Sequence, residues 1–426
     1  MTKEGFWNKN LILYLLSRAF LAFGSNTYTF AVSFYIMYYT GSAIYSSINL
    51  IIFTLISLLF LPVAGVISDS RNKKSIIILG EALDPLILIG LLVYTYYFGF
   101  NLVALYITTA LLTITGSFVG NAFQSAITAL FNVDKVQKVY GYSSILTESA
   151  SLLGPIIAGA LIGIFSFEIM IMIFIVFNII ALSFDFNLKF KQQNQIEEKN
   201  EEISSIKQFF KDVSGGIQYI KESSILKMII VYLFFINFVT TTISILPAKM
   251  LINILELNST LVGFCYAALS SVGTILGGMI ISTVKVFEKP LSIAKIFSIL
   301  FAIIIALLPL PIYLELSDIG NTILISLLFI LITLTVQFVN TPIMSYYQTT
   351  IDDSMKGRVF SLISVFSMMT MPIGFFIFGL LYDLELYFVV NIFAGVLTLI
   401  VTIFLLKTNI INEANDDYQL EIQKEK

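Results

Sequence analysis

Histidine is absent from this 426-residue chain, and cysteine and tryptophan occur once each. Without histidine there are no imidazole metal ligands, histidine-dependent nucleophile triads or histidine proton relays, so any proton transfer falls to carboxylates. The single cysteine, Cys265, allows neither a disulfide framework nor a thiolate metal cluster. We therefore expect no cofactor and no bound metal, and we do not expect an enzyme.

Charge is also scarce. Charged residues make up 12% of the chain, 58% of its residues are hydrophobic, and its mean hydropathy is +0.92. This composition excludes ordinary soluble domains. At about 20 apolar residues per crossing, the hydrophobic residues fill about twelve transmembrane helices, so the fold class is an all-α integral membrane protein. The 24 basic and 27 acidic residues nearly balance, so the lipid bilayer is an expected partner and nucleic acid is not.

Gaps between charged residues predict the spans. Residues 19–68 carry no charge and break at 39–42, and residues 85–133 in the same way break at 98–101, which gives two helical hairpins. Further spans are predicted at 140–165, 169–188, 228–248, 257–284, 296–314, 319–341, 359–382 and 386–406. We expect an N-terminal six-helix half (1–188), a linker (189–224), a C-terminal six-helix half (225–406) and a solvated tail (407–426).

The linker contains apolar residues at helical spacing. Ile206, Phe209, Phe210, Val213, Ile217 and Ile220 recur among lysines. This pattern predicts a short amphipathic helix on the inner membrane surface, with a solvated helix as an equal alternative. If both termini and the linker are cytoplasmic, Arg18 lies in a span, Lys249 lies outside, and every other basic residue lies inside, which is the favoured orientation.

An internal repeat indicates that the two halves are related. After the fourth span the chain reads Asp134, Lys135, Lys138 and then Gly154-Pro155. After the tenth span a similar loop holds Asp353, Lys356, Gly357 and Arg358, followed by Met371-Pro372. Matching loops at corresponding places are expected of two related halves.

Two motifs carry a family resemblance. The loop after span two reads Gly65, Asp69, Arg71, Lys73 and Lys74, in which Asp69 can accept hydrogen bonds from a helix N-terminus and the basic residues hold the inner surface. Its alternative is an ordinary positive-inside loop. The loop resembles the signature of the major facilitator superfamily, Gly-x-x-x-Asp followed by basic residues, whereas the loop after span eight has Ser282 in place of the acid.

The second motif lies in span five. Gly154, Pro155 and Gly159 place small residues beside a proline, which suits close helix packing or a plain proline kink. The run resembles the antiporter motif of drug exporters, Gly-Pro-x-x-Gly-Gly, with Ala158 as a departure.

Within that superfamily the chain resembles the macrolide-efflux branch. The resemblance rests on Thr40-Gly41-Ser42-Ala43, the loop from Asp69 to Lys74, Gly141-Tyr142-Ser143, Gly357 to Leu362, Met371 to Gly374, and Gly379 to Asp383. It implies two pseudo-symmetric six-helix halves and proton-driven export of a bulky amphipathic compound. Exporters of siderophores and lysophospholipids share several of these landmarks.

Four charged residues lie inside predicted spans. Counted from the nearest flanking lysine at about 1.5 Å per residue, Arg18, Asp84 and Glu148 each lie about 13 to 15 Å deep, near the middle of a core about 30 Å thick. Glu81 precedes Asp84 by three residues on the same helical face. A buried charge costs at least about 2.5 to 3.5 kcal/mol, so each needs a partner or water.

Two arrangements remain open for these charges. In one, Glu148 and either Asp84 or Glu81 exchange protons, while Arg18 tunes the pKa of the acid or releases the acid when substrate binds. In the other, Arg18 and Asp84 form a permanent ion pair that fixes helix packing. Because third helices in the superfamily lie toward the lipid, Glu148 is the preferred coupling residue.

The resemblance also implies a cavity lined by the first and fourth helices of each half. Its candidate polar residues are Asn26, Asn121, Gln124, Asn237, Gln337 and Asn340, each of which can instead bond a neighbouring helix. We expect a monomeric, proton-coupled exporter of hydrophobic or amphipathic small molecules in a bacterial inner or plasma membrane. The alternatives are a lysophospholipid or siderophore exporter, a non-transporting membrane receptor, and an intramembrane enzyme.

Overall fold

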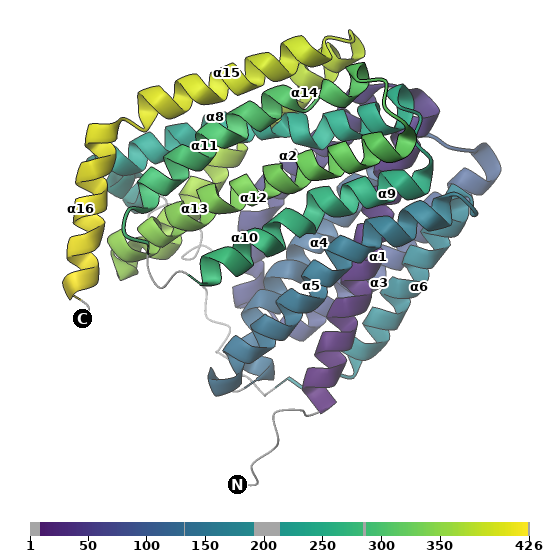
Figure 1. Cartoon of the computed structure of the whole chain (residues 1–426). Coiled ribbons are helices and arrows are strands. Elements are labelled where there is room, and N and C mark those ends of the chain that lie inside the picture. The colour runs from purple at the N-terminus through teal and green to yellow at the C-terminus, as the bar shows by residue number, and fades with distance from the viewer. Residues whose placement is uncertain (1–8, 132, 191–213, 284–286, 425–426) are drawn as a thin grey trace. The chain divides into compact units, whose positions relative to one another are not determined.

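The computed structural model describes residues 9–131, 133–190, 214–283 and 287–424 (Figure 1). Within these residues the chain forms helices and no strand. Eleven of the described helical segments are long and apolar enough to cross a membrane. The N-terminal helix α1 is not among them, because Arg18, Asn26 and several tyrosines interrupt its apolar residues, although it runs over 32 residues. The protein is a multi-pass membrane protein.

The first half contains six long helices in sequence order. They are α1 (Lys9–Thr40), α2 (Ala43–Ser70), α3 (Lys73–Phe98), α4 (Leu102–Leu130), α5 (Val133–Ile162) and α6 (Phe167–Phe186). The predicted breaks at 39–42 and 98–101 are confirmed, since α1 and α3 end beside Gly41 and Gly99, both with positive φ. Asn72 and Asn101 cap α3 and α4 by accepting the backbone N–H of Ser75 and Ala104.

The second half is more interrupted. Its elements are α8 (Ser224–Ala248), the π-helix η1 (Lys249–Ile254), α9 (Ser259–Ala267), the π-helix η2 (Ala268–Val272), α10 (Gly273–Ser282), α11 (Pro290–Leu307), the 3-10 helix η3 (Leu310–Tyr313), α12 (Asp318–Thr350), α13 (Asp353–Met368), α14 (Met371–Asp383), α15 (Tyr387–Leu405) and α16 (Thr408–Lys424). The predicted eleventh span is divided into α13 and α14 just before Pro372, where a proline fits the first turn of a new helix.

The helices group into two compact units. The first unit holds α1, α2 from Ile48 onward, α3 to α6, and α9. The second unit holds the first turn of α2 (Ser42–Ser47), α8, and α10 to α16.

The two units repeat one packing pattern. In the first, α1 packs on α5 and α6, and α3 packs on α4 and α6. In the second, α8 packs on α13, α14 and α15, and α11 packs on α12 and α15. Each pair in one unit has its counterpart at the corresponding position of the other, as expected of two related six-helix halves.

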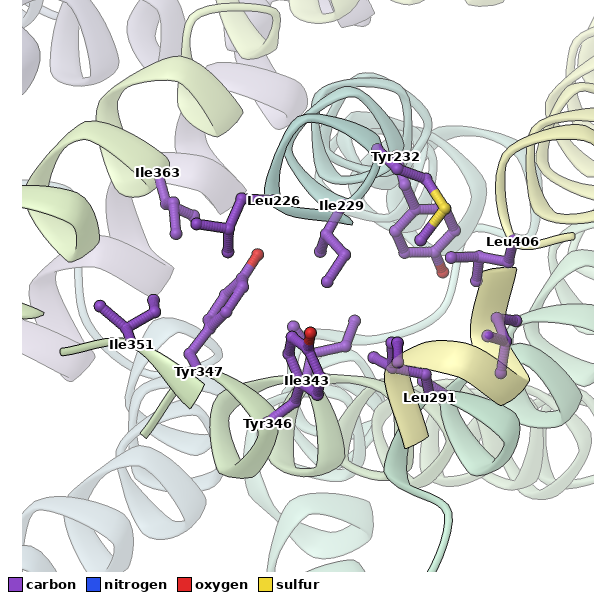
Figure 2. Close-up of a cluster of buried hydrophobic side chains, with 14 of the residues drawn as sticks. Leu226, Ile229, Tyr232, Leu291, Ile343, Tyr346, Tyr347, Ile351, Ile363 and Leu406 are labelled. Carbon is purple, nitrogen blue, oxygen red and sulfur yellow. The ribbon is translucent and has the colours of Figure 1, made fainter. Parts of the chain in front are cut away.

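Buried side chains of the second unit form one large cluster. Figure 2 shows Leu226, Ile229 and Tyr232 of α8 converging with side chains from α11, α12 and α13. Ile220, from the helical residues 214–222, belongs to the same cluster. The described end of the linker therefore packs Ile220 in a protein core instead of placing it on a membrane surface, while Ile206, Phe209, Phe210 and Val213 lie outside the described residues.

The C-terminal tail is also structured, which differs from the predicted solvated end. Residues 408–424 form α16, which packs on α11 and α12 and turns away from α15 (Figure 1). Tyr418 is only 2% exposed and lies in the cluster, and Asn415 accepts the backbone N–H of Leu291. The prediction of a solvated tail at 407–426 overlooked the apolar face of this amphipathic helix.

Candidate functional site: a buried charge cluster in the first unit

Three charged side chains meet between α1, α3 and α6. The Nη2 atom of Arg18 lies 2.9 Å from Oε1 of Glu81 and 3.2 Å from Oδ2 of Asp185. The Ser17 hydroxyl also donates a hydrogen bond to Oδ2 of Asp185. One guanidinium thus serves two carboxyl groups that come from distant parts of the chain.

The position of the cluster follows from helix geometry. Long helical side chains lean toward the N-terminus of their own helix, so the guanidinium of Arg18 lies below its Cα, toward the start of α1. Asp185 lies one residue before the end of α6, which runs antiparallel to α1, as shown by the two hydrogen bonds between Asn10 and Lys189. Counting residues to the Cα of Arg18 predicts a position near the middle of the membrane core. The cluster instead lies closer to the end of the unit where α1 begins.

The surroundings of the cluster are apolar. Phe123 of α4 places its ring centroid 3.5 Å from the Cζ atom of Arg18, a cation–π contact. The side chains of Glu81 and Asp185 are 1% and 0% exposed, whereas Arg18 is 17% exposed. The ion pairs are therefore poorly screened, and the removal of one partner leaves an uncompensated buried charge.

Asp84 does not belong to this cluster. It accepts a hydrogen bond from the hydroxyl of Thr115 on α4. Although Glu81 and Asp84 lie three residues apart, α3 packs against both α6 and α4, and each acid contacts a different neighbour. The alternative ion pair between Arg18 and Asp84 is therefore wrong, and Glu81 takes its place.

Asp185 is not among the residues predicted from the sequence, whereas Glu148 is the preferred one. Glu148 is exposed on α5 and is not a partner in the ion pairs of Arg18. The overlooked signal was an acid within the predicted sixth span, close to its end, where no basic residue precedes it along the helix. An unmatched charge in an apolar run is a reason to look for a distant partner.

The loop after α2 is only partly described. A Cβ atom at Gly65 meets no atom within 4 Å, so the described residues show no close helix contact there. Arg71 is exposed, Lys73 is buried, and the Nζ atom of Lys74 donates to the carbonyl oxygens of Phe186 and Leu188 at 3.0 and 2.9 Å. Lys74 thus caps the end of α6 beside the cluster. The side chain of Asp69 lies outside the described residues.

The antiporter-like motif lies where α5 is closely packed on two sides. A Cβ atom at Gly154 stands 2.7 Å from Cβ of Asn26 on α1. A Cβ atom at Gly159 stands 2.3 Å from the carbonyl oxygen of Ser259 and 3.0 Å from Cα of Gly263 on α9. Pro155 contributes its carbonyl oxygen to the same contact, 2.4 Å from a Cβ atom at Gly263. Both glycines are thus required by close helix packing.

The other predicted residues are placed less distinctively. Arg358 is exposed at the start of α13, whereas the side chain of Asp353 and the surroundings of Gly357 lie outside what the structure describes. Asn26, Asn121 and Asn237 each donate a hydrogen bond to the carbonyl four residues earlier in their own helix, so these bonds join no two helices. Gln337 lies against Gly277 of α10, and Gln124 and Asn340 are exposed.

The described residues contain no group of three or more His, Cys, Asp or Glu side chains placed to hold a metal ion. The charge cluster itself places two carboxyl groups, each able to bind and release a proton, next to the positive charge of Arg18.

Comparison with known proteins identifies the fold. The model of the Major Facilitator Superfamily matches residues 14–375. No curated protein matches the chain.

Three solved structures resemble it over almost their whole length. A bacterial homologue of the iron transporter ferroportin in an inward-facing state has a TM-score of 0.71 at 13% identity, covering 93% of this chain and 98% of its own. The peptide transporter POT in complex with sulfate has a TM-score of 0.70 at 13% identity, covering 97% of both chains. A D-xylose–proton symporter has a TM-score of 0.66 at 10% identity, covering 93% and 97%. At these identities the likeness shows the fold alone.

Proposed function

Because the chain belongs to the Major Facilitator Superfamily, whose fold is that of transporters, we propose that it is a proton-coupled exporter of hydrophobic or amphipathic small molecules. The observation that carries the transport function is the family match over residues 14–375. The repeated packing of α1, α3 and α6 in one unit and α8, α11 and α15 in the other supports alternating access by movement of two related halves.

The export direction rests on the motif in α5. Its resemblance to the antiporter motif of drug exporters is supported by geometry, since α1 and α9 pack so closely on Gly154 and Gly159 that neither position has room for a Cβ atom. A proline kink by itself requires no glycine at either position, so the packing favours the antiporter-like reading.

The substrate class rests on the candidate cavity residues. Asn26, Asn121 and Asn237 are amides on helices rich in aromatic and aliphatic residues, and none of them carries charge. Such a lining suits a bulky, largely apolar compound with a few polar groups, as a macrolide is. Proton coupling rests on the buried acids Glu81, Asp84 and Asp185, since the chain has no histidine.

The test is accumulation of a labelled macrolide in pump-deficient bacterial cells that carry the wild type, Glu148→Gln or an empty vector, each with and without a protonophore. We expect low accumulation with the wild type, restored to the empty-vector level by the protonophore. Glu148→Gln distinguishes the two candidate coupling sites: transport is lost if Glu148 carries the proton and retained if the cluster does.

Equal accumulation in all cells, with the protein shown to be in the inner membrane, contradicts macrolide export. The same cells are then loaded with a labelled lysophospholipid or siderophore. Export of either compound assigns the chain to that alternative. If the macrolide, the lysophospholipid and the siderophore are all retained, proton movement across the membrane still excludes a purely receptor role.

A further inference from the structure

We propose that Glu81 and Asp185 hold a single exchangeable proton between them, so that the cluster with Arg18 is electrically neutral. The role of this proton in transport rests on the proposed function. The presence of the proton rests on geometry alone and can be measured without a transported substrate.

The first argument is the count of charges. Arg18 supplies one positive charge, and the two carboxyl groups within 2.9 and 3.2 Å of its Nη2 atom supply two negative charges when both are ionised. Lys74 at the end of α6 donates to the backbone carbonyl oxygens of Phe186 and Leu188 and forms no ion pair with either acid. The other neighbours are uncharged, namely Phe123 of α4 and the phenol of Tyr14 on α1. Two ionised carboxylates side by side in an apolar core repel each other, and one proton removes the excess charge.

Each acid also has a second carboxyl oxygen, which does not bond Arg18. Oε2 of Glu81 and Oδ1 of Asp185 are both buried and have no hydrogen-bond partner among the described residues. The two carboxyl groups nevertheless lie close together, since Oε1 of Glu81 and Oδ2 of Asp185 both contact the same Nη2 atom of Arg18. A proton on one carboxyl group lets it donate to the other, which gives the pair the donor that it otherwise lacks.

A metal cation is a poorer occupant of this position. The guanidinium of Arg18 already contacts one oxygen of each acid, and a second cation next to it meets strong repulsion in an apolar environment. Ser17 contributes a hydroxyl that donates to Asp185 and is thereby used. A proton adds neither volume nor a coordination shell.

The location of the cluster determines how the proton enters and how it affects helix packing. Arg18 is the partly exposed member of the cluster, so we expect protons to reach the acids along its side chain. Loss of the proton leaves a net negative charge between α1, α3 and α6, which favours water entry or separation of these helices. Protonation therefore biases the packing of the first unit, which is what coupling to a conformational change requires.

The experiment compares infrared spectra of the purified protein in lipid nanodiscs at neutral pH, recorded in H2O and in D2O. A protonated carboxyl group gives a carbonyl stretch that shifts in D2O, whereas a carboxylate does not. We expect this band in the wild type and its loss in both Glu81→Gln and Asp185→Asn, because in either variant the remaining acid ionises as the sole partner of Arg18. Glu168→Gln, at the opposite end of α6, is the matched control and leaves the band unchanged.

Because the band could also disappear when a variant misfolds, a further variant is expected to increase it. Arg18→Gln removes the positive charge, so both acids hold protons and the band increases. Absence of the band from the wild type, or its survival in either acid variant, overturns the shared proton. A band that behaves as expected in a protein without proton-driven transport leaves the proton site intact and refutes the proposed function, whereas proton-driven transport without the band does the reverse.

Discussion

The carboxylate of Asp383 accepts the backbone N–H of Ala43 at 2.7 Å, so the last residue of α14 caps the first turn of α2. The same carboxylate accepts the N–H of Ile44 at 3.1 Å and the hydroxyl of Ser42, and the Nζ atom of Lys249 lies 3.2 Å away. The sequence analysis predicted this chemistry for Asp69, at the other end of α2. The structure shows it at Asp383, and it joins two landmarks of the macrolide-efflux resemblance, Ser42-Ala43 and Gly379 to Asp383.

Replacement of Asp383 by alanine is expected to lower stability by about 0.5 to 2 kcal/mol, the usual value of an N-cap. The effect is concentrated on α2, because only 17% of its most apolar stretch is buried and its start depends on this anchor. Thermal unfolding in nanodiscs measures the loss. Glu385→Ala, two residues further on, is the control, and equal melting of the two variants contradicts an anchoring role.

Gly379→Ala is expected to disturb the packing of α14 against the start of α2. A Cβ atom there lies 2.4 Å from Oγ and 2.9 Å from Cβ of Ser47, and 3.3 Å from Cα of Ile44. Rotation of the serine hydroxyl relieves the first clash but not the second. Removal of the serine side chain in Gly379→Ala/Ser47→Gly is therefore expected to restore thermal stability, and a double variant no better than the single one argues against the clash.

Arg18→Gln is expected to destabilise the protein by about 3 to 5 kcal/mol at neutral pH, because two buried acids lose their shared partner. In this variant both acids must take up protons to stay neutral, and because that uptake costs less at lower pH, the loss shrinks as the pH falls. Unfolding followed from neutral to acidic pH measures this difference. The double variant Arg18→Gln/Glu81→Gln removes one acid as well and is expected to recover part of the stability at neutral pH; simple additivity of the two single variants is the contrary result.

Gly159→Ala is expected to separate α5 from α9, because the atoms that its Cβ meets belong to the backbone of Ser259 and Gly263 and cannot rotate away. Gly116→Ala on α4 is the matched control, since a Cβ there meets nothing within 4 Å and alanine favours a helix by about 1 kcal/mol over glycine. We expect a lowered melting temperature for the first and an unchanged or raised one for the second. Similar melting of both removes the packing argument for the antiporter-like motif.

Tyr418→Ala is expected to loosen α16 from the second unit. Its ring is 2% exposed, and its hydroxyl is hydrogen-bonded to that of Ser345 at 2.9 Å. Loss of a buried aromatic side chain costs about 3 to 5 kcal/mol, whereas Tyr418→Phe loses one hydrogen bond worth about 1 kcal/mol. Limited proteolysis distinguishes them: cleavage within 408–424 increases in the alanine variant and changes little in the phenylalanine variant. Rapid cleavage of the wild type is the outcome at odds with a packed helix.

The amino-acid sequence by itself determined the number of helical spans and where they break. The hydrophobic length needed to cross a bilayer and the preference of asparagine and glycine for helix ends are local properties, and for that reason the ends of α1 and α3 lie at the predicted residues. The sequence also identified Arg18 and Glu81 as charges that need partners.

Only the tertiary structure decided which partners they have. Glu81 and Asp84 lie one turn apart on α3, and the rotation of α3 between α4 and α6 directs the first to Arg18 and the second to Thr115. Asp185 and Asp383 acquire their roles in the same way, since each contacts residues far away in the chain. Counting residues along one helix shows that a charge lies within a span, but its burial and its partner depend on how several helices pack, and spacing in the sequence does not encode that packing locally.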